Sequence, residues 1–552
     1  MFLKKHKHLS VFVIIFVAWH LKQSQCFHSE ISFIYLDDHG TPFVSQESHD
    51  NEVVTGTFTD KTESEGFSYL TIEANSAFPD EVQAYSAGYM EGILTSLKIN
   101  QMFSNTGAGG WPISDNVKSF IAENLYFMKA KVDRNQDHSY WYHTGLLMFQ
   151  IKGIEDAFLG NPCKVSRDID PMGPMWMFQW QMGELSDIET KFGSVEKRFP
   201  SFSCSALVRN LGSDLLASHV TWGDYIMMLR IIKKVTLPFR MSNSDNQTLP
   251  AATVLESSYP AIINSVDDYY ITSQKLTILE TTNGIQNRTL YDYITANNSA
   301  PYFVRVMVSN RLSSSGQEWT DYFGKFNSGT YNNQWMVVDY KQFNPKDSQP
   351  IKAGTLHVLE QLPGFIMAKD MSHTLVSSDY QNAWVSYNVP YFEATQQINN
   401  YSAYINEYGL FYSHDQCPRA NIFRRDLHKS QDLNSTIALM RYNDFQNDPY
   451  AKCNCTPLGY SSENGISARC ELNPLNGTYN IASESARCHG ATDFKITNAE
   501  MINSLQMVAI SGPTHSQQPV FDWTLQENTA CKGISPEGHP KRFKFGPVLV
   551  DI

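Results

Sequence analysis

The chain has 552 residues, of which 42 % are hydrophobic and 13 % aromatic, enough for one large core or two. Its formal net charge is −13 at pH 7, and the acidic excess is not offset by any basic cluster. This charge argues against nucleic acid as a partner and against electrostatic docking on an anionic membrane.

Residues 1–26 have the parts of a secretory signal peptide. Lys4, Lys5 and Lys7 form a positive segment, Leu9–Ala18 is apolar, and small residues precede an expected cut before Phe27. The apolar run is too short to span a membrane comfortably, and no later stretch approaches a spanning length, so we expect no transmembrane anchor. Removal of this segment takes away four lysines and no acidic residue, which moves the net charge from −13 to −17.

Seven Asn-x-Ser/Thr sequons also fit passage through the secretory pathway, and they predict a glycoprotein of the lysosomal lumen or the extracellular space. All of them follow Cys204, which indicates a large exposed surface on the C-terminal part. The predicted acceptors are Asn246, Asn287, Asn297, Asn400, Asn434, Asn454 and Asn476.

Nine cysteines are present, and six of them gather in the last quarter of the chain. In an oxidising compartment these six are expected to form disulfides, with a pairing that the sequence leaves open: Cys417, Cys453, Cys455, Cys470, Cys488 and Cys531. The Cys453-Asn454-Cys455 run lacks a second close ligand pair, so we predict no metal site and no cofactor. Cys163 and Cys204 stand apart, and a lone cysteine of this kind is a candidate nucleophile.

The N-terminal third mixes strands and helices. Residues 31–45 read as a hairpin and Phe67–Glu73 as a strand, and helical spacing begins near Pro79 and continues to Phe103. Further helices are predicted at Val117–Lys131 and Ser139–Asp156. The pair Gly88 and Gly92 predicts a close helix contact, and His138 and His143 are expected to be structural or surface residues. Residues 181–187 resume a helical pattern, and residues 188–203 lose periodicity and become polar, as an exposed segment would.

The next segment, Phe199–Ile231, contains a β-hairpin. Cys204 begins a short apolar strand, Asn210–Asp214 supplies the turn, and Leu215–Trp222 returns. If Arg209 pairs with Leu215, Cys204 faces Val220, and His219, Thr221 and Trp222 come within a residue or two of the thiol. A slip of one residue would invert every side chain, so the sequence leaves open which of them share the face of Cys204.

A hairpin that begins with cysteine is what an N-terminal-nucleophile hydrolase requires. The precursor would cut itself between Ser203 and Cys204, and the new α-amine would act as base for the thiol. Proton transfer between the two costs little, because an α-amine titrates near about 7.7–8.0 and a free thiol near about 8.5. The alternative is that Cys204 is an ordinary buried strand cysteine.

Beyond the hairpin, Thr221–Lys234 is predicted to be helical, and strands then dominate. The predicted strands are Ala252–Leu255, Tyr269–Glu280, Tyr302–Val308, Asn333–Asp339 and Thr355–Gln361. A β-rich centre with helices on either side indicates stacked sheets covered by helices. We find no internal repeat and no long linker.

Five stretches along the chain resemble the phospholipase B-like family of secreted and lysosomal proteins, also called lamina ancestor-like: Tyr85–Asn100, Cys204–Ile231, Val358–Asp370, Trp384–Phe392 and Arg419–Pro449. The resemblance implies an α+β fold, a four-layer αββα sandwich of the N-terminal-nucleophile hydrolase type. It also implies self-cleavage into two fragments that stay associated in one domain, residues 27–203 and 204–552, and hydrolysis of acyl bonds in lipids.

The resemblance carries roles over to the hairpin. Cys204 matches the nucleophile and new N-terminus, with the cut between Ser203 and Cys204. His219, Thr221 and Trp222 match an HxTW-type element on the return strand, and the mechanism of the superfamily leaves their individual roles open.

Two further positions match the family outside the hairpin. Asn388 in SYNVP resembles a position suited to the oxyanion hole, where one donor is worth about 2.7–4 kcal/mol. Its alternative role is turn formation before Pro390. Arg441 in MRYNDF either orients the substrate or pairs with Asp444 in the core.

Three functions stay open at this point. The first is an acyl hydrolase that deacylates phospholipids through a cysteine thioester. The second is an amidase of the same fold acting on N-acyl lipids or small amides, and the third is a catalytically inactive lipid-binding glycoprotein. The partner in each case is a lipid or an acylated small molecule. No G-x-S-x-G elbow, H-E-x-x-H helix or P-loop points elsewhere, and the oligomeric state, a homodimer included, is open.

Overall fold

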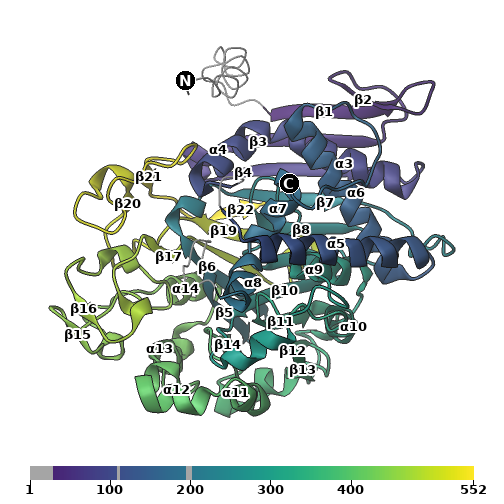
Figure 1. The fold of residues 1–552 in the computed structure, drawn as a ribbon. Helices are drawn as coiled ribbons and strands as arrows, with labels where there is room; N and C mark the ends of the chain where they lie inside the picture. Colours follow the sequence, from purple (N-terminus) through teal and green to yellow (C-terminus); the bar gives the residue numbers. More distant parts are fainter. Residues whose placement is uncertain (1–28, 109–111, 194–201) are drawn as a thin grey trace, which may run out of the picture.

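The computed structural model of the protein describes residues 29–108, 112–193 and 202–552. The predicted signal peptide lies outside the described residues. The fold is of the mixed α+β class and is organised on two large β-sheets (Figure 1). Within the described residues, no helix is both long and apolar enough to cross a membrane.

The larger sheet has eleven strands in the order β13-β12-β11-β10-β9-β8-β7-β4-β3-β1-β2. Neighbouring strands are antiparallel except β4 and β7, which are parallel. The strands are β1 (Ser29–Leu36), β2 (Pro42–Ser45), β3 (Val54–Lys61), β4 (Phe67–Ala74), β7 (Ile231–Thr236), β8 (Thr253–Ser258), β9 (Tyr269–Thr272), β10 (Leu276–Thr282), β11 (Asn333–Asp339), β12 (Leu356–Leu362) and β13 (Phe365–Asp370).

The second sheet has seven strands in the order β14-β5-β6-β18-β19-β22, and β17 pairs with β6 beside this row. Its strands are β5 (Phe202–Asn210), β6 (Leu215–Asp224), β14 (Ala383–Ser386), β17 (His489–Ala491), β18 (Asp493–Thr497), β19 (Met507–Ser511) and β22 (Val548–Val550). β14 is an edge strand of this sheet, and β5 lies directly inside it.

The two sheets share a hydrophobic core. Ala206 and Ala217 of the smaller sheet belong to the same buried cluster as Leu279 and Met336 of the larger one. Because side chains alternate along a strand, the neighbouring Ile278 points to the opposite face of the larger sheet, into a second core built largely from helices. The predicted site residues Cys204, His219 and Thr221 have the same parity as Ala206 and Ala217 along β5 and β6, and they therefore lie in or beside the layer where the two sheets meet.

Helices cover the outer face of each sheet. The helices that line the core on the larger sheet are α4 (Ser96–Thr106), α5 (Asp115–Arg134), α6 (Ser139–Leu159), α7 (Pro174–Gln181), α8 (Leu185–Lys191), α9 (Tyr302–Leu312) and α10 (Gly316–Phe323). On the smaller sheet, α13 (Pro418–Asp426) and α14 (Leu433–Met440) contribute to a separate core with β5 and β6. In Figure 1, α13, α11 (Glu393–Ile398) and α12 (Tyr401–Tyr408) lie at the bottom of the view, near β14.

The glycine pair predicted to allow a close helix contact does so. A Cβ on Gly88 of α3 (Asp80–Leu94) would lie 1.9 Å from the carbonyl oxygen of Gln150 in α6, and one on Gly92 would lie 2.6 Å from the Ala157 Cβ. The single helix expected from Pro79 to Phe103 is divided at Thr95, whose hydroxyl donates to the Glu91 carbonyl.

Several secondary-structure predictions are wrong. The single strand predicted at Tyr269–Glu280 is a hairpin, in which β9 ends at Thr272 and the antiparallel β10 begins at Leu276. Tyr302–Val308 lies in helix α9 rather than in a strand, because a short apolar run cannot by itself separate a buried strand from a buried helix. Thr221–Lys234 is not helical: β6 continues to Asp224, a single 3-10 turn follows, and β7 begins at Ile231. The predicted strands at Asn333–Asp339 and Thr355–Gln361 match β11 and, within one residue, β12.

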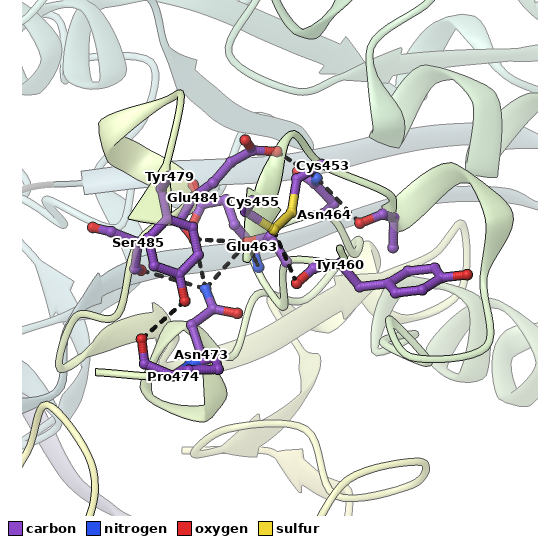
Figure 2. The surroundings of a disulfide bond; sticks show 12 residues. Cys453, Cys455, Tyr460, Glu463, Asn464, Asn473, Pro474, Tyr479, Glu484 and Ser485 are labelled. Carbon is purple, nitrogen blue, oxygen red and sulfur yellow. Dashed lines mark hydrogen bonds between the residues drawn. A yellow bond between two sulfur atoms is a disulfide. The ribbon is translucent and has the colours of Figure 1, made fainter. Parts of the chain in front are cut away.

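The cysteines of the last quarter are only partly disulfide-bonded. Cys453 pairs with Cys455 and Cys488 with Cys531, whereas Cys417 and Cys470 are buried free thiols, so the expectation that all six form disulfides is wrong. Figure 2 shows the Cys453–Cys455 bridge beside a loop where the Asn464 side chain donates to Glu484. His143 is buried with its Nε2 3.1 Å from the Arg240 carbonyl, as a structural histidine would be.

Candidate active site at Cys204

The register of the β5–β6 hairpin decides which side chains share the face of Cys204. Arg209 pairs with Leu216 and Asn210 with Leu215, so Cys204 lies opposite Thr221 and not Val220. The predicted register is wrong by one residue because the loop has four residues, closed by a hydrogen bond from the Leu211 amide to the Asp214 carbonyl.

This shift of one residue sorts the predicted residues onto two faces. Thr221 shares the face of Cys204, and His219, two residues away on β6, lies on the same face. Trp222 pairs with Ser203 and points to the other face, into the core under α13 and α14. The structure therefore brings Cys204, His219 and Thr221 together and places Trp222 behind them.

The Cys204 thiol is buried against a carboxyl group from the other sheet. Its Sγ donates to Glu280 Oε1 of β10 over 3.4 Å, and both side chains are inaccessible to solvent. Burial, followed by the nearby Glu280, raises the pKa of Cys204 well above its usual range. Burial and then Asp268 do the same to the pKa of Glu280. We call Cys204 and Glu280 the thiol–carboxyl pair, and both groups are neutral at rest.

The backbone of Cys204 is held from two other elements. Its amide nitrogen donates to Asn388 Oδ1 at 3.1 Å, and its carbonyl oxygen accepts from Arg419 Nη1 of α13 at 2.6 Å. The Arg419 guanidinium lies 4.2 Å from the centre of the Trp222 ring, whose Nε1 donates to the Ile466 carbonyl. Trp222 thus supports the arginine that holds the Cys204 backbone.

Asn388 follows β14 and adopts a left-handed backbone conformation with φ of 66°. Its side-chain oxygen is occupied by the Cys204 amide, and its Nδ2 donates to the Thr282 carbonyl at 2.7 Å. The predicted proximity to Cys204 is present, and the contact is with the nitrogen that a backbone cut would convert to an amine.

His219 is the middle of a hydrogen-bonded chain. Its Nε2 lies 2.8 Å from the Glu280 carbonyl oxygen, which can only accept, so Nε2 carries the proton. Nδ1 then accepts from the Thr221 hydroxyl at 3.4 Å, and Thr221 accepts from Lys495 Nζ at 2.6 Å. Burial, with the charge of Lys495, lowers the pKa of His219 to about 3. His219 is therefore neutral and orients its neighbours.

Behind Thr221 lies a group of four buried charges, here called the ion network: Arg230, Lys495, Asp267 and Asp493. Lys495 Nζ is 2.8 Å from Asp493, and Arg230 pairs with Asp493 at 2.6 Å and also with Asp267. Burial alone would raise the pKa of Asp493, but Arg230 and Lys495 lower it to about 2. Burial lowers the pKa of Lys495 to about 8.

Arg441, the remaining predicted catalytic residue, does not contact Cys204. It is buried, and its guanidinium donates to the carbonyl oxygens of Gly512 and Pro513. Burial lowers its pKa to about 10. Its bonds are to backbone carbonyls and not to Asp444, which was the partner expected for a core role.

Two clusters in the described residues have a ligand set that a metal ion could use: Cys204, His219 and Glu280, and Glu463, Cys470 and His489. A cation already lies beside each cluster. Lys495 reaches Thr221 next to the first, and Arg487 donates to Glu463 at 2.9 Å in the second. A second positive charge would therefore be opposed at both places.

Sequence reasoning missed Glu280, Arg419 and Lys495. Glu280 lies in a strand that is buried except at its last residue, LTILETT, and Lys495 lies in a fully buried strand, DFKIT. A charged residue in such a strand is a signal that it serves a site. Arg419 lies in the RANIFRRD stretch, where nothing local sets it apart.

Comparison with known proteins shows which family the chain resembles along its length. Residues 54–550 match the family model for phospholipase B. The chain is 37 % identical over 516 residues to the human "putative phospholipase B-like 2", which covers 91 % of this chain and 86 % of the relative. It is 38 % identical to the "putative phospholipase B-like 1" of Caenorhabditis elegans, over 90 % of this chain and 87 % of the relative. The "phospholipase B-like protein B" of Dictyostelium discoideum is 33 % identical over 94 % and 88 % of the two chains.

Proposed function

Because the chain belongs to the phospholipase B family, we propose that it is an acyl hydrolase that cuts its own backbone before Cys204 and then deacylates phospholipids through a thioester on that cysteine. One observation carries the proposal: the thiol of Cys204 faces a carboxyl group, while its backbone nitrogen, the amine-to-be, is held by Asn388. A buried strand cysteine without a function would also need an acceptor for its backbone N–H, but it would not need a buried carboxyl group beside its thiol.

We assign the fold to the four-layer αββα sandwich of N-terminal-nucleophile hydrolases, as one domain made of residues 27–203 and 204–552. Its support is the core shared by the two sheets and the helices packed on their outer faces. The nucleophile would stand near the start of a strand of one sheet and face the other sheet.

The proposed self-cleavage is an N-to-S acyl shift. The Cys204 thiol proton moves to the carboxylate form of Glu280, and the sulfur attacks the Ser203 carbonyl carbon. The bond from that carbon to the Cys204 nitrogen breaks, and the nitrogen receives the proton from Glu280. Water then hydrolyses the thioester, which leaves a carboxylate on Ser203 and a free amine and thiol on Cys204.

In the mature enzyme, the new amine takes over as base. It accepts the thiol proton, and the resulting ammonium stabilises the thiolate that attacks the acyl carbon of the substrate. Asn388 Oδ1 keeps the amine in place, and an N–H of its amide with a backbone N–H holds the oxyanion. The alcohol leaves with a proton, and water clears the acyl-enzyme with the same amine as base.

The compartment belongs to the proposal as well. Six of the seven sequon asparagines are exposed and Asn287 is half-buried, and the described residues contain two disulfides. Both features favour maturation in the secretory pathway and a final location in the lysosomal lumen or outside the cell.

A substrate panel with matched variants tests the function. The wild type should release fatty acid from glycerophospholipids, the Cys204→Ala variant should not, and Cys163→Ala, which removes another buried thiol, should behave as the wild type. Release from N-acyl amides in place of esters would favour the amidase alternative. Lipid binding without release of any acyl chain would favour the lipid-binding glycoprotein.

A further inference from the structure

A cavity of about 220 Å³ lies beside the edge strand β14. One wall is the face of α13 that carries Ala420, Phe423 and Arg424. Another is formed by Trp384 of β14 and by Tyr387, which directly follows that strand. The space is large enough for one small organic group. None of the catalytic candidates described above lines it.

Several of the side chains that line the cavity are aromatic, and their rings are inclined to one another. The Trp384 and Tyr391 rings are 4.7 Å apart and inclined by 60°, and Tyr391 and His414 are 5.3 Å apart and inclined by 75°. Tyr387 lies 5.4 Å from His414. Rings set at steep angles surround a small group from several sides, which is how aromatic side chains enclose a cation.

The hydroxyl groups of this lining are already used within the protein. Tyr380 and Tyr391 bond to each other at 2.7 Å, and the Tyr387 hydroxyl donates to the His414 carbonyl at 2.7 Å. A ligand in the cavity therefore meets aromatic rings whose hydroxyl groups are already bonded, and the face of such a ring has a negative quadrupole. Such a lining suits a cation that carries methyl groups and no N–H donors.

The charges around the cavity favour a cation as well. Asp379 and Asp415 line it and are exposed, whereas burial lowers the pKa of His414 and keeps that ring neutral. The one cationic side chain, Arg424, already donates to the Asp415 carbonyl and to Asn421. The lining is therefore net negative.

We propose that this cavity binds a quaternary ammonium group, the choline of a phospholipid head group. Tyr387 in its wall precedes Asn388, and Ala420 follows Arg419, so the cavity begins one residue from the two side chains that hold the Cys204 backbone. The role of head-group subsite rests on the proposed lipid substrate. The binding of the cation does not.

Direct binding to the uncut Cys204→Ala chain tests the proposal without any catalysis. In calorimetric titrations, choline and tetramethylammonium should saturate one site, and ethanolamine, a primary ammonium ion that loses more hydration, should bind at least about tenfold more weakly. Equal affinity for choline and ethanolamine, or no saturable binding of choline, would overturn the proposal.

Two pairs of variants assign the binding to this cavity. Tyr391→Leu, which removes a ring face, should weaken choline binding at least about fivefold, while Tyr391→Phe keeps the ring and should bind as the parent does. The Asp379→Asn/Asp415→Asn double variant should also bind more weakly, and Asp137→Asn, on the exposed loop between α5 and α6, should not. Unchanged binding in Tyr391→Leu and in the double aspartate variant, with unchanged melting temperatures, would contradict the assignment.

Lipid assays separate this proposal from the hydrolase itself. Glycerophosphocholine should compete with choline for the site, and the wild type should prefer phosphatidylcholine over phosphatidylethanolamine in mixed micelles. Hydrolysis without any such preference, and without choline binding, would refute the subsite and leave the hydrolase standing. Choline binding without hydrolysis of any lipid would support the cation site and refute the enzyme.

Discussion

Two buried clusters meet at Thr221, and they solve the same electrostatic problem in opposite ways. In the ion network, Arg230 and Lys495 pair with Asp267 and Asp493, so the charges persist without water. In the thiol–carboxyl pair, Cys204 and Glu280 have no such counter-charge in contact, and burial raises both pKa values and keeps both groups neutral. Among equally buried groups, contact with an opposite charge therefore decides whether a group is ionised.

The contrast explains why the uncut chain would be inactive before maturation. A neutral thiol is a poor nucleophile, and burial and Glu280, which raise the pKa of Cys204, outweigh the backbone of Trp222 and the charge of Lys495, which favour the thiolate. A cut before Cys204 would add an ammonium group at the nitrogen that Asn388 holds, and this would supply the missing positive charge. The ion network, by comparison, serves to fix Thr221 and, through it, His219.

Glu280→Gln is the strongest test of the thiol–carboxyl pair. The amide keeps the shape but cannot accept the thiol proton, so self-cutting should slow by about 10²–10⁴-fold. Below pH 4.5, the ordinary pKa of glutamate, the side chain is protonated in both the folded and the unfolded chain, so an uncharged amide replaces an uncharged carboxyl and the free energy of unfolding should change by less than about 1 kcal/mol. Intact-mass time courses and thermal melting measure the two effects.

The matched control is Glu256→Gln. Glu256 is another buried carboxyl of the larger sheet, whose pKa burial raises to about 8, and its substitution should leave the cutting rate unchanged. A Glu280→Gln chain that cuts as fast as the wild type would remove Glu280 from the mechanism.

Arg230→Met tests the ion network. It leaves two buried aspartates with only Lys495 as counter-charge, and the free energy of unfolding should fall by about 3–5 kcal/mol. The measurement is denaturant unfolding in the uncut Cys204→Ala background. Lys118→Met, which breaks an exposed pair with Asp115, should cost about 0–1 kcal/mol. Similar losses of unfolding free energy in Arg230→Met and Lys118→Met would contradict the expectation that a buried charge left unpaired costs more than an exposed one.

Thr221→Val probes the link between the clusters. It removes the hydroxyl that accepts from Lys495 and donates to His219, at an expected cost of about 1–3 kcal/mol in the free energy of unfolding. Cutting should slow less than in Glu280→Gln, since no reacting group is lost. Thr221→Ser keeps the hydroxyl and should retain most of both properties; a serine variant as defective as the valine one would show that packing, not the hydrogen bond, matters.

The stability contributions of the thiol–carboxyl pair and of the ion network should change with pH in opposite directions. The folded-state pKa of Glu280 is raised above its ordinary 4.5, so its contribution to stability is full below that pH and is lost as the pH rises. The pKa of Asp493 is lowered from 3.8 to about 2, so its contribution is present above 3.8 and is lost as the pH falls toward 2. Stability curves of Glu280→Gln and Asp493→Asn, each subtracted from the wild type, should slope in opposite directions. Equal slopes would contradict the assigned charge states.

The sequence predicted the local part of the site and not the part made by tertiary contacts. The hairpin and the proximity of Cys204, His219 and Thr221 follow from turn chemistry within 20 residues. The register did not follow, because a loop of four residues or of five fits the same turn sequence. Glu280 comes from the facing sheet, 76 residues beyond Cys204, and only the packing of the two sheets brings it to the thiol.

The same division holds for the fold. Strands with regular apolar character, such as β11 and β12, are predicted within a residue. The strand predicted at Tyr302–Val308 is wrong because this Val- and Phe-rich run is buried on all sides in α9, so that neither a period of 2 nor one of 3.6 is visible in the sequence. The disulfides expected for Cys417 and Cys470 are wrong because pairing depends on distances between the cysteines, which their spacing in the sequence does not give.

N-terminal sequencing and intact mass of the purified, active protein test the central claim most directly. The account predicts two associated fragments, one of which begins at Cys204, and a single uncut chain for Cys204→Ala. An active protein that consists of one unbroken chain, or one in which the Cys204 sulfur is held in a disulfide, would contradict it.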